Sequence, residues 1–301
     1  MSHFTCLVIT NLTDPDLTHE QVMNEVDRLM APYDETKDVE PYDEESYDAA
    51  RIAEMRERDY KYVRENRPDT AEEEIARKSA LTDYKFLLED LYLDDNPALL
   101  RDNGDGTYTQ LSTYNPMSQW DWYSVGGRWE GFPSVEGGRD IPITVGRLSQ
   151  VDRVGEALRR EKEAEERYDK FEEATKGLEV PASWEAHREH LYPDDINAAR
   201  DAYNSNPWVQ AAKSVEEFMG ENPHDHFKVG KGGREHYVRD ARLSACTTSA
   251  MVTPDGKWHP NGQMGRFGMS SGDNDAWPLQ FQDYLDGLDE DYWFAFLDLH
   301  S

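Results

Sequence analysis

HFTCLVIT, at residues 3–10, is the stretch of sequence that decides the fold. It is rich in β-branched and aromatic residues and too short to form a buried helix, so it predicts a central or half-buried strand. A second run of this kind, YWFAFLDLH at residues 292–300, predicts the last strand. Both runs are short, apolar and bounded by turn or helix signals, so we expect the two strands to be neighbours in one sheet.

Between these strands, the helical signals fall in blocks. Thr18 and Gln21 form a capping box at the start of a helix that Pro32 ends. Residues 34–100 contain 21 acidic and 10 basic residues together with helical apolar stripes. Residues 151–220 predict a long charged helix and then a shorter one.

Strands joined by turns and helices gathered in blocks favour an α+β fold over a doubly wound one. We expect an antiparallel or mixed sheet, of the kind found in ferredoxin-like folds, with helices on one face. Both ends of the chain form this sheet, and two acidic helical insertions interrupt it. The expected domains are an α+β core of residues 1–33, 101–150 and 221–301, and insertions at 34–100 and 151–220.

Smaller elements follow from local signals. Residues 102–106, DNGDG, resemble part of a calcium loop but lack the carboxylates needed at its first and last positions, so they predict a hairpin turn. Further elements of the core are strands at residues 107–111, 141–148, 235–239 and 243–253, and a short helix at residues 277–285.

The composition limits the partners. The chain has 301 residues, of which 62 are acidic and 32 basic, giving a formal charge of −30. A field of this sign repels nucleic-acid backbones and anionic membranes, so we expect neither as a direct partner. The acidity fits a well-solvated surface, and it also fits an imitation of nucleic acid offered to a basic host protein. Cys6 and Cys246 have no metal-site spacing and suit a reducing cytosol.

Residues 114–132 form the densest aromatic and glycine block, YNPMSQWDWYSVGGRWEGF. Its glycines allow positive φ, so two aromatic strands can fold back on each other. One interpretation is a pocket in which aromatic side chains stack on a flat ligand and Arg128 meets a phosphate or carboxylate. The other is an aromatic hairpin core in which Arg128 pairs with a nearby carboxylate. The aromatic candidates are Trp120, Trp122, Tyr123 and Trp129.

A second block, TPDGKWHPNGQMGRFGM, occupies residues 253–269. Its turn signals are followed by Trp258, His259 and Arg266 on a glycine-rich stretch. Long loops of this kind often carry function, although a loop that only wraps the surface has the same composition. We add Trp258 and His259 to the predicted ligand-binding residues.

Three polar residues lie near the ends of the chain. Asp298 and His300 are two residues apart on the last strand, so their side chains point to the same face of the sheet. If the terminal strands pair, His3 converges with them. Two histidines and an aspartate suit a metal site or acid–base catalysis, and polar strand ends without a function are the alternative. No cysteine or histidine spacing is diagnostic of a metal ligand set, and no motif identifies a cofactor.

Four blocks of the sequence together resemble a family of uncharacterised bacteriophage proteins. Members of that family begin with a similar MSHFT strand, carry WDWY followed by GGRW, and end in a strand with Asp and His. The resemblance implies a viral accessory protein made in the host bacterial cytoplasm, and it implies no activity. The matching blocks are residues 1–10, 115–132, 253–269 and 294–300.

These observations lead to two functional hypotheses. The leading one is a phage accessory protein that counters a host defence system by binding a host protein or a small nucleotide-type ligand through its aromatic and glycine blocks. The alternative is a metal-assisted or acid–base hydrolase of a small nucleotide that uses His3, Asp298 and His300. The sequence does not decide whether the protein is an enzyme.

Overall fold

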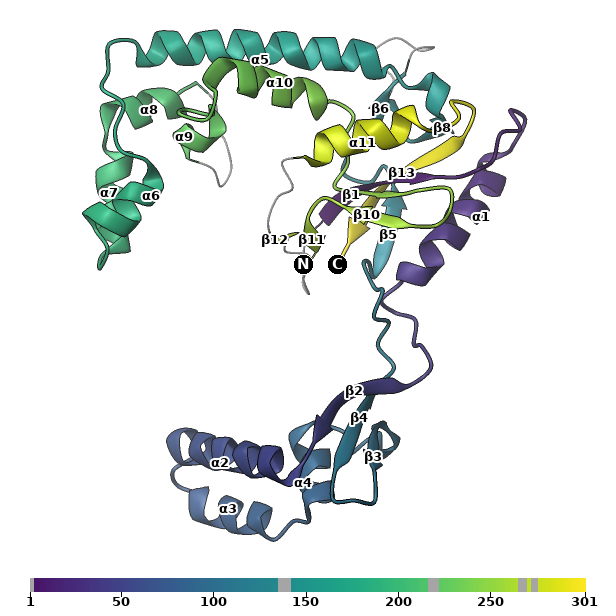
Figure 1. Ribbon diagram of the computed structural model, residues 1–301, viewed down its shortest axis with the longest axis vertical. Helices are drawn as coiled ribbons and strands as arrows, with labels where there is room; N and C mark the ends of the chain where they lie inside the picture. The colour runs from purple at the N-terminus through teal and green to yellow at the C-terminus, as the bar shows by residue number, and fades with distance from the viewer. Residues whose placement is uncertain (1–2, 135–141, 216–221, 265–269, 272–275) are drawn as a thin grey trace. The chain divides into compact units, whose positions relative to one another are not determined.

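The computed structural model describes residues 3–134, 142–215, 222–264, 270–271 and 276–301. The chain folds into two compact units, each described by itself below. The larger unit contains Met1–Pro32 and Gln119–Ser301, and the smaller one contains Tyr33–Ser118. Figure 1 shows the elements along the chain. Every helix within the described ranges is too short or too polar to cross a membrane.

A mixed sheet forms the centre of the larger unit. Its strand order is β10-β9-β1-β13-β5, and β8 pairs with another part of β13. β1 runs antiparallel to β13 and parallel to β9. The bounds are β1 (His3–Ile9), β5 (Trp122–Val125), β8 (Val145–Arg147), β9 (Ala250–Val252), β10 (Trp258–Pro260) and β13 (Trp293–His300). The α+β class, the mixed sheet and the pairing of the terminal strands are thus confirmed, whereas a ferredoxin-like arrangement is not.

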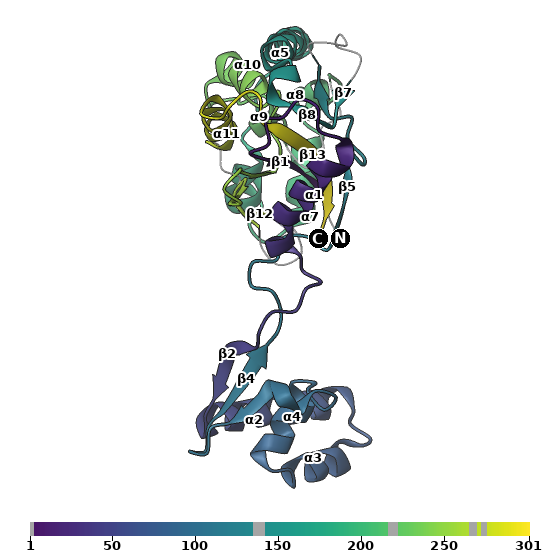
Figure 2. The ribbon, with the colours of Figure 1, turned by 90° about the vertical axis from the view of Figure 1, so that its right-hand side faces the viewer.

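Helices cover both faces of this sheet, so the expectation of helices on one face was wrong. On one face, Leu7 and Phe296 pack in one core cluster with Phe281 of α11 (Trp277–Asp286). On the other, α1 (His19–Met30) contacts β1 and β13 (Figure 2). Residues alternate between faces along a strand, and both faces of β1 and β13 are apolar, so each needs its own cover.

The larger unit also contains a group of helices with a core of its own, which we call the helical arm. Its longest helix, α5 (Arg153–Thr175), packs along α10 (Gly233–Leu243). Its core is aromatic, and the rings of Phe171 and Phe227 stack 4.0 Å apart. The remaining elements are α6 (Trp184–Ala186), a π-helical turn (His187–Leu191), α7 (Ile196–Asn204), α8 (Pro207–Lys213) and α9 (Pro223–His226).

The smaller unit has its own sheet and its own core. The strand order is β2-β4-β3, and β3 and β4 form the hairpin predicted at the DNGDG turn. Tyr47, Phe86 and Leu87 are central members of its buried cluster. Its elements are β2 (Tyr42–Tyr47), α2 (Ala49–Asn66), α3 (Ala71–Ser79), α4 (Asp83–Asp90), β3 (Leu100–Asp102) and β4 (Tyr108–Ser112).

The structure divides the chain differently from the expected domains. Residues 101–118 were expected in the core, but β4 pairs with β2, which ties them to the smaller unit. That unit is therefore not purely helical. Residues 235–239 were expected to form a strand, but they lie in α10, because Tyr237 is buried in the arm's aromatic cluster.

Short elements complete the described residues. Two small antiparallel pairs are β6 (Phe132–Pro133) with β7 (Pro142–Ile143), and β11 (Gln263–Met264) with β12 (Ser270–Ser271). Single 3-10 turns are Ala31–Tyr33, Pro97–Leu99 and Leu148–Gln150.

Candidate functional site

The pairing of β1 with β13 brings His3, Asp298 and His300 together. His3 lies directly opposite His300, and their ring centroids are 5.1 Å apart. His3 Nδ1 lies 2.9 Å from Asp298 Oδ1. Residues directly opposite each other in an antiparallel pair share a face, as do residues two apart on one strand. The register therefore places all three side chains at one end of one face.

Asp298 is held by several donors although it is almost fully buried, with 1% of the residue exposed. The backbone N–H of Arg128 donates to its Oδ2 over 3.1 Å, and the side chain of Trp129 also hydrogen-bonds to it. Burial by itself raises the pKa of Asp298, but the bonds from His3, Arg128 and Trp129 outweigh it and lower the pKa below its ordinary value. Asp298 is therefore a carboxylate at neutral pH.

The turn after β5 approaches Asp298 closely because it contains two glycines. Gly126 and Gly127 have φ values of +68° and +56°. A Cβ atom on Gly127 would lie 2.4 Å from Cβ of Asp298. Only glycine fits this backbone conformation and this space without a shift, and the turn thereby directs the N–H of Arg128 at the carboxylate.

His300 has a carboxylate of its own. Its Nδ1 lies 2.6 Å from Oδ1 of Asp121, and the backbone N–H of Asp121 donates to the carbonyl of His300 over 3.1 Å. The ring of Trp122 stacks on His300 at a centroid distance of 5.3 Å and meets the edge of His3 at 5.2 Å. We call His3, Asp298, His300 and Asp121 the histidine–carboxylate cluster.

The two carboxylates determine which nitrogen of each ring is available. A carboxylate accepts hydrogen bonds, so the Nδ1 of His3 and of His300 carries the proton in each pair. The Nε2 atoms then hold the lone pairs, and within the described residues neither accepts a hydrogen bond. The side chains of His3 and His300 keep 11% and 9% of their area exposed. Each imidazole is thus oriented to exchange a proton through Nε2.

Three of the predicted ligand-binding residues surround this cluster. Trp122 and Trp129 are 45% and 41% exposed, so neither is a core residue, and the aromatic-hairpin-core interpretation does not hold for them. The side chain of Arg128 is 62% exposed, and its Nε lies 4.0 Å from Asp298 Oδ2. The aromatic block and the terminal residues therefore form one site rather than two.

Trp120 and Tyr123 lie elsewhere. Tyr123 is next to Trp122 on β5 and so points to the opposite face, where its hydroxyl donates to Asp27 of α1. The Trp120 ring meets the edge of the Tyr123 ring at 5.2 Å and is only 8% exposed. Both residues anchor β5 to the α1 side of the sheet.

Trp258 and His259 are on β10, the edge strand beyond β9. Trp258 contacts Phe4 edge-on at 6.4 Å, whereas His259 lies 4.5 Å from the ring of Tyr284 in α11. His259 Nε2 is also 3.2 Å from the hydroxyl of Thr253. His259 is paired through Met251 with Leu7, four residues along β1 from His3, so it does not belong to the histidine–carboxylate cluster. Arg266 lies outside the described residues.

Asp121 is the residue of the cluster that sequence reasoning missed. It lies between Trp120 and Trp122 in the quoted aromatic block, where only the aromatic residues, the glycines and Arg128 were singled out. The pairing of β5 with the end of β13, Trp122 opposite His300, brings it to His300. Long-range strand order supplies that pairing, and no local signal encodes it.

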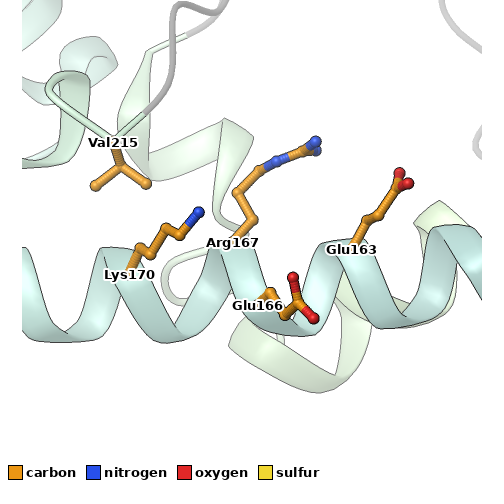
Figure 3. A pocket seen from close by; sticks show the side chains of 5 residues that line it. All are labelled: Glu163, Glu166, Arg167, Lys170 and Val215. Carbon is orange, nitrogen blue, oxygen red and sulfur yellow. The ribbon is translucent and has the colours of Figure 1, made fainter.

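Two other features of the larger unit are not sites of the same kind. A hollow on α5 is lined by Glu163, Glu166, Arg167, Lys170 and Val215 (Figure 3). In the arm, both nitrogens of His224 are used structurally, with the Tyr203 hydroxyl at 2.8 Å and the carbonyl of Pro181 at 3.1 Å. Among the described residues, no group of three or more His, Cys, Asp or Glu side chains is arranged to hold a metal ion.

Fold and site together define an α+β protein with two adjacent histidines, each oriented by a carboxylate. Comparisons of the chain with protein-family models, curated proteins and solved structures find no match. The function is therefore argued from the geometry of the site.

Proposed function

We propose that the histidine–carboxylate cluster is an acid–base site that hydrolyses a phosphate ester of a small nucleotide. The observation that carries this proposal is the pair of adjacent imidazoles, 5.1 Å apart between centroids, each with Nδ1 bonded to its own carboxylate. A carboxylate that fixes the tautomer of a histidine is a recurrent element of acid–base catalysis.

The chemistry requires two proton transfers. One imidazole takes a proton from water through Nε2 while the water oxygen forms a bond to phosphorus. The bond from phosphorus to the leaving oxygen breaks, and the second imidazole, protonated beforehand, gives its Nε2 proton to that oxygen. The first imidazole gains one proton and the second loses one, so the reaction is balanced. Both rings then return to their starting protonation states by exchanging protons with solvent. Asp298 and Asp121 act as positioning residues because each holds a ring.

The residues around the cluster suit a nucleotide. Trp122 and Trp129 expose flat aromatic surface on which a base can stack. The exposed guanidinium of Arg128 is a bidentate donor suited to a phosphate, and its ion pair with Asp298 at 4.0 Å is too long to occupy its donors.

The resemblance to phage proteins suggests a biological role for this activity. A phage accessory protein in the host bacterial cytoplasm that removes a small nucleotide would counter a host defence system that depends on that nucleotide. This part of the proposal rests on the resemblance, and the chemistry rests on the site.

Turnover of nucleotides tests the proposal. The purified protein is incubated with an excess of nucleoside cyclic phosphates, dinucleoside monophosphates and nucleoside triphosphates, and the recovered molecules are compared with the input. We expect many molecules of product per protein molecule from at least one phosphate ester. Turnover should fall by about 10²- to 10⁴-fold with His300→Gln and with His3→Gln. It should stay at the wild-type rate with His236→Gln, which changes a half-buried histidine of α10. Product formed by His300→Gln at the wild-type rate would refute the proposal.

Binding without turnover is the second candidate function. The exposed rings of Trp122 and Trp129 favour it, because stacking and ion pairing need no catalysis. In that case a nucleotide raises the melting temperature as mass action requires and is recovered unchanged. A host protein is the partner if neither turnover nor stabilisation is found, and the smaller unit, with 23 acidic and 11 basic residues, is then the surface to test.

A further inference from the structure

A row of small polar groups crosses the sheet from the histidine–carboxylate cluster. Asp298 is directly opposite Ser124 on β5 and Thr5 on β1, so the three side chains share one face. The row continues to Ser249, whose hydroxyl lies 3.4 Å from that of Thr5 and whose N–H donates to Thr5 Oγ1 over 3.0 Å. It ends at Asn261, whose N–H donates to the carbonyl of Ser249 over 2.8 Å.

The row is partly open and, beyond Asp298, uncharged. Ser124, Thr5, Ser249 and Asn261 are each half-buried. Within the part of the chain that the structure describes, Oδ1 of Asn261 is buried and has no hydrogen-bond partner. A buried acceptor without a donor is unfavourable, so the Asn261 amide is the group of the row whose hydrogen bonding is incomplete.

These groups differ from those that bind polyphosphates. Di- and triphosphates are held by several cations, helix N-termini or bound Mg²⁺. Hydroxyl and amide groups instead match the hydroxyls of a sugar and the edges of a base. The formal charge of −30 adds to this preference, because each further negative charge on a ligand is repelled.

The cluster therefore has a different surface on each side. Trp122 lies against His300 on one side, and the hydroxyls of Thr5 and Ser249 extend on the other. We propose, on the basis of the function proposed above, that the substrate is a phosphodiester that joins two nucleosides. One base stacks on Trp122, the phosphodiester lies at the histidines with its single negative charge, and the second nucleoside lies along the polar row.

The proposal predicts a particular effect of two variants. Ser249→Ala and Asn261→Ala each remove one hydrogen-bonding group without disturbing a side chain that holds the sheet, since Thr5 Oγ1 still accepts from the Ser249 N–H. For a dinucleoside monophosphate we expect KM to rise about 3- to 10-fold in each variant, with kcat changed little. For a nucleoside 2′,3′-cyclic phosphate, which has no second nucleoside, we expect an unchanged KM. Ser205→Ala, an exposed serine of the arm, is the control.

Calorimetric titration of the same dinucleoside onto each variant separates this proposal from the proposed function. Turnover that depends on His300 but shows no change of KM in either row variant would overturn the two-nucleoside substrate and leave the acid–base site standing. Binding that weakens in Ser249→Ala and Asn261→Ala, without turnover, would support the row and refute the catalysis. A triphosphate that binds more tightly than the dinucleoside would also overturn the inference.

Discussion

At the scale of single residues, Gly127 sets the distance between the turn after β5 and Asp298. Its φ of +56° lies in the left-handed region, and a Cβ there would be 2.4 Å from Oδ2 of Asp298. Gly104 has a φ of +78° with nothing within 4 Å of the corresponding Cβ position. A side chain at either glycine would strain the left-handed backbone to a similar extent. Only at Gly127 would it also clash with a neighbouring residue.

The first prediction compares these two glycines. Gly104→Ala should lower the free energy of unfolding by about 1–2 kcal/mol, the cost of a left-handed alanine. Gly127→Ala should cost more than that and should also abolish turnover, because the Arg128 N–H moves away from Asp298. Urea unfolding and activity are measured on both. Equal losses of stability, with activity kept in both, would show that the close approach to Asp298 has no role.

The second prediction concerns the pH dependence of stability. The pKa of Asp298 in the folded state is lowered from 3.8, so its stabilising contribution is complete above the unfolded pKa and is lost as the pH falls through the folded pKa. As the pH falls below about 5, the free energy of unfolding of the wild type should therefore decrease more steeply than that of Asp298→Asn. Parallel curves for the two proteins would mean that the carboxylate gains nothing from its donors.

Alternation along a strand explains which site residues the sequence predicts. It places Asp298 and His300 on one face from their spacing alone, and His3 follows once the terminal strands pair. By the same rule, the consecutive residues Trp122 and Tyr123 lie on opposite faces of the sheet. The prediction that the whole aromatic block lines one pocket did not take this into account. The Asp121–His300 contact depends on the neighbour of β13, which no local pattern of residues specifies.

At the scale of elements, aromatic packing determines which residues of the helical arm are helical. α10 was expected to be a strand at residues 235–239, where Tyr237 and Val238 have β propensity. Burial of Tyr237 against the aromatic rings on α5 outweighs that propensity. Val154 and Leu158 on the first turns of α5 are 73% and 53% exposed, because the arm's cluster begins further along the helix.

The third prediction tests the arm's core. Phe227 is fully buried and stacks on Phe171 at 4.0 Å, so Phe227→Ala should cost about 3–5 kcal/mol of unfolding free energy. Activity at the histidine–carboxylate cluster should be unchanged at temperatures where the variant is folded, since the arm lies in a different core cluster from the sheet. Loss of turnover in a folded Phe227→Ala protein would contradict that independence.

At the scale of the whole molecule, charge distinguishes the candidate partners. With a formal charge of −30, the protein repels an anionic nucleotide and attracts a basic protein. Composition predicts this property directly. The division into two units follows from the pairing of β4 with β2, which joins residues as far apart in the chain as Tyr42 and Ser112 and which the expected boundaries did not include.

The fourth prediction follows from the negative net charge of the protein. Raising the ionic strength from 0.01 M to 0.15 M shortens the Debye length from about 30 Å to about 8 Å. KM for a nucleotide substrate should then fall, because the repulsion is screened. For a basic host protein bound to the acidic units, affinity should instead fall steeply with salt. A KM that rises with salt would indicate that local cations, and not the field of the whole protein, govern access to the site.

The central claim is that His3 and His300 act together as acid and base, and a double-mutant cycle on kcat tests it most directly. Single-turnover rates are compared for the wild type, His3→Gln, His300→Gln and the double variant, each checked for folding by its melting curve. If the two imidazoles serve one chemical step, each single variant should lose about 10²- to 10⁴-fold, and the double variant should lose far less than the product of the two. Independent losses that multiply, or a single variant that keeps its rate, would contradict the account.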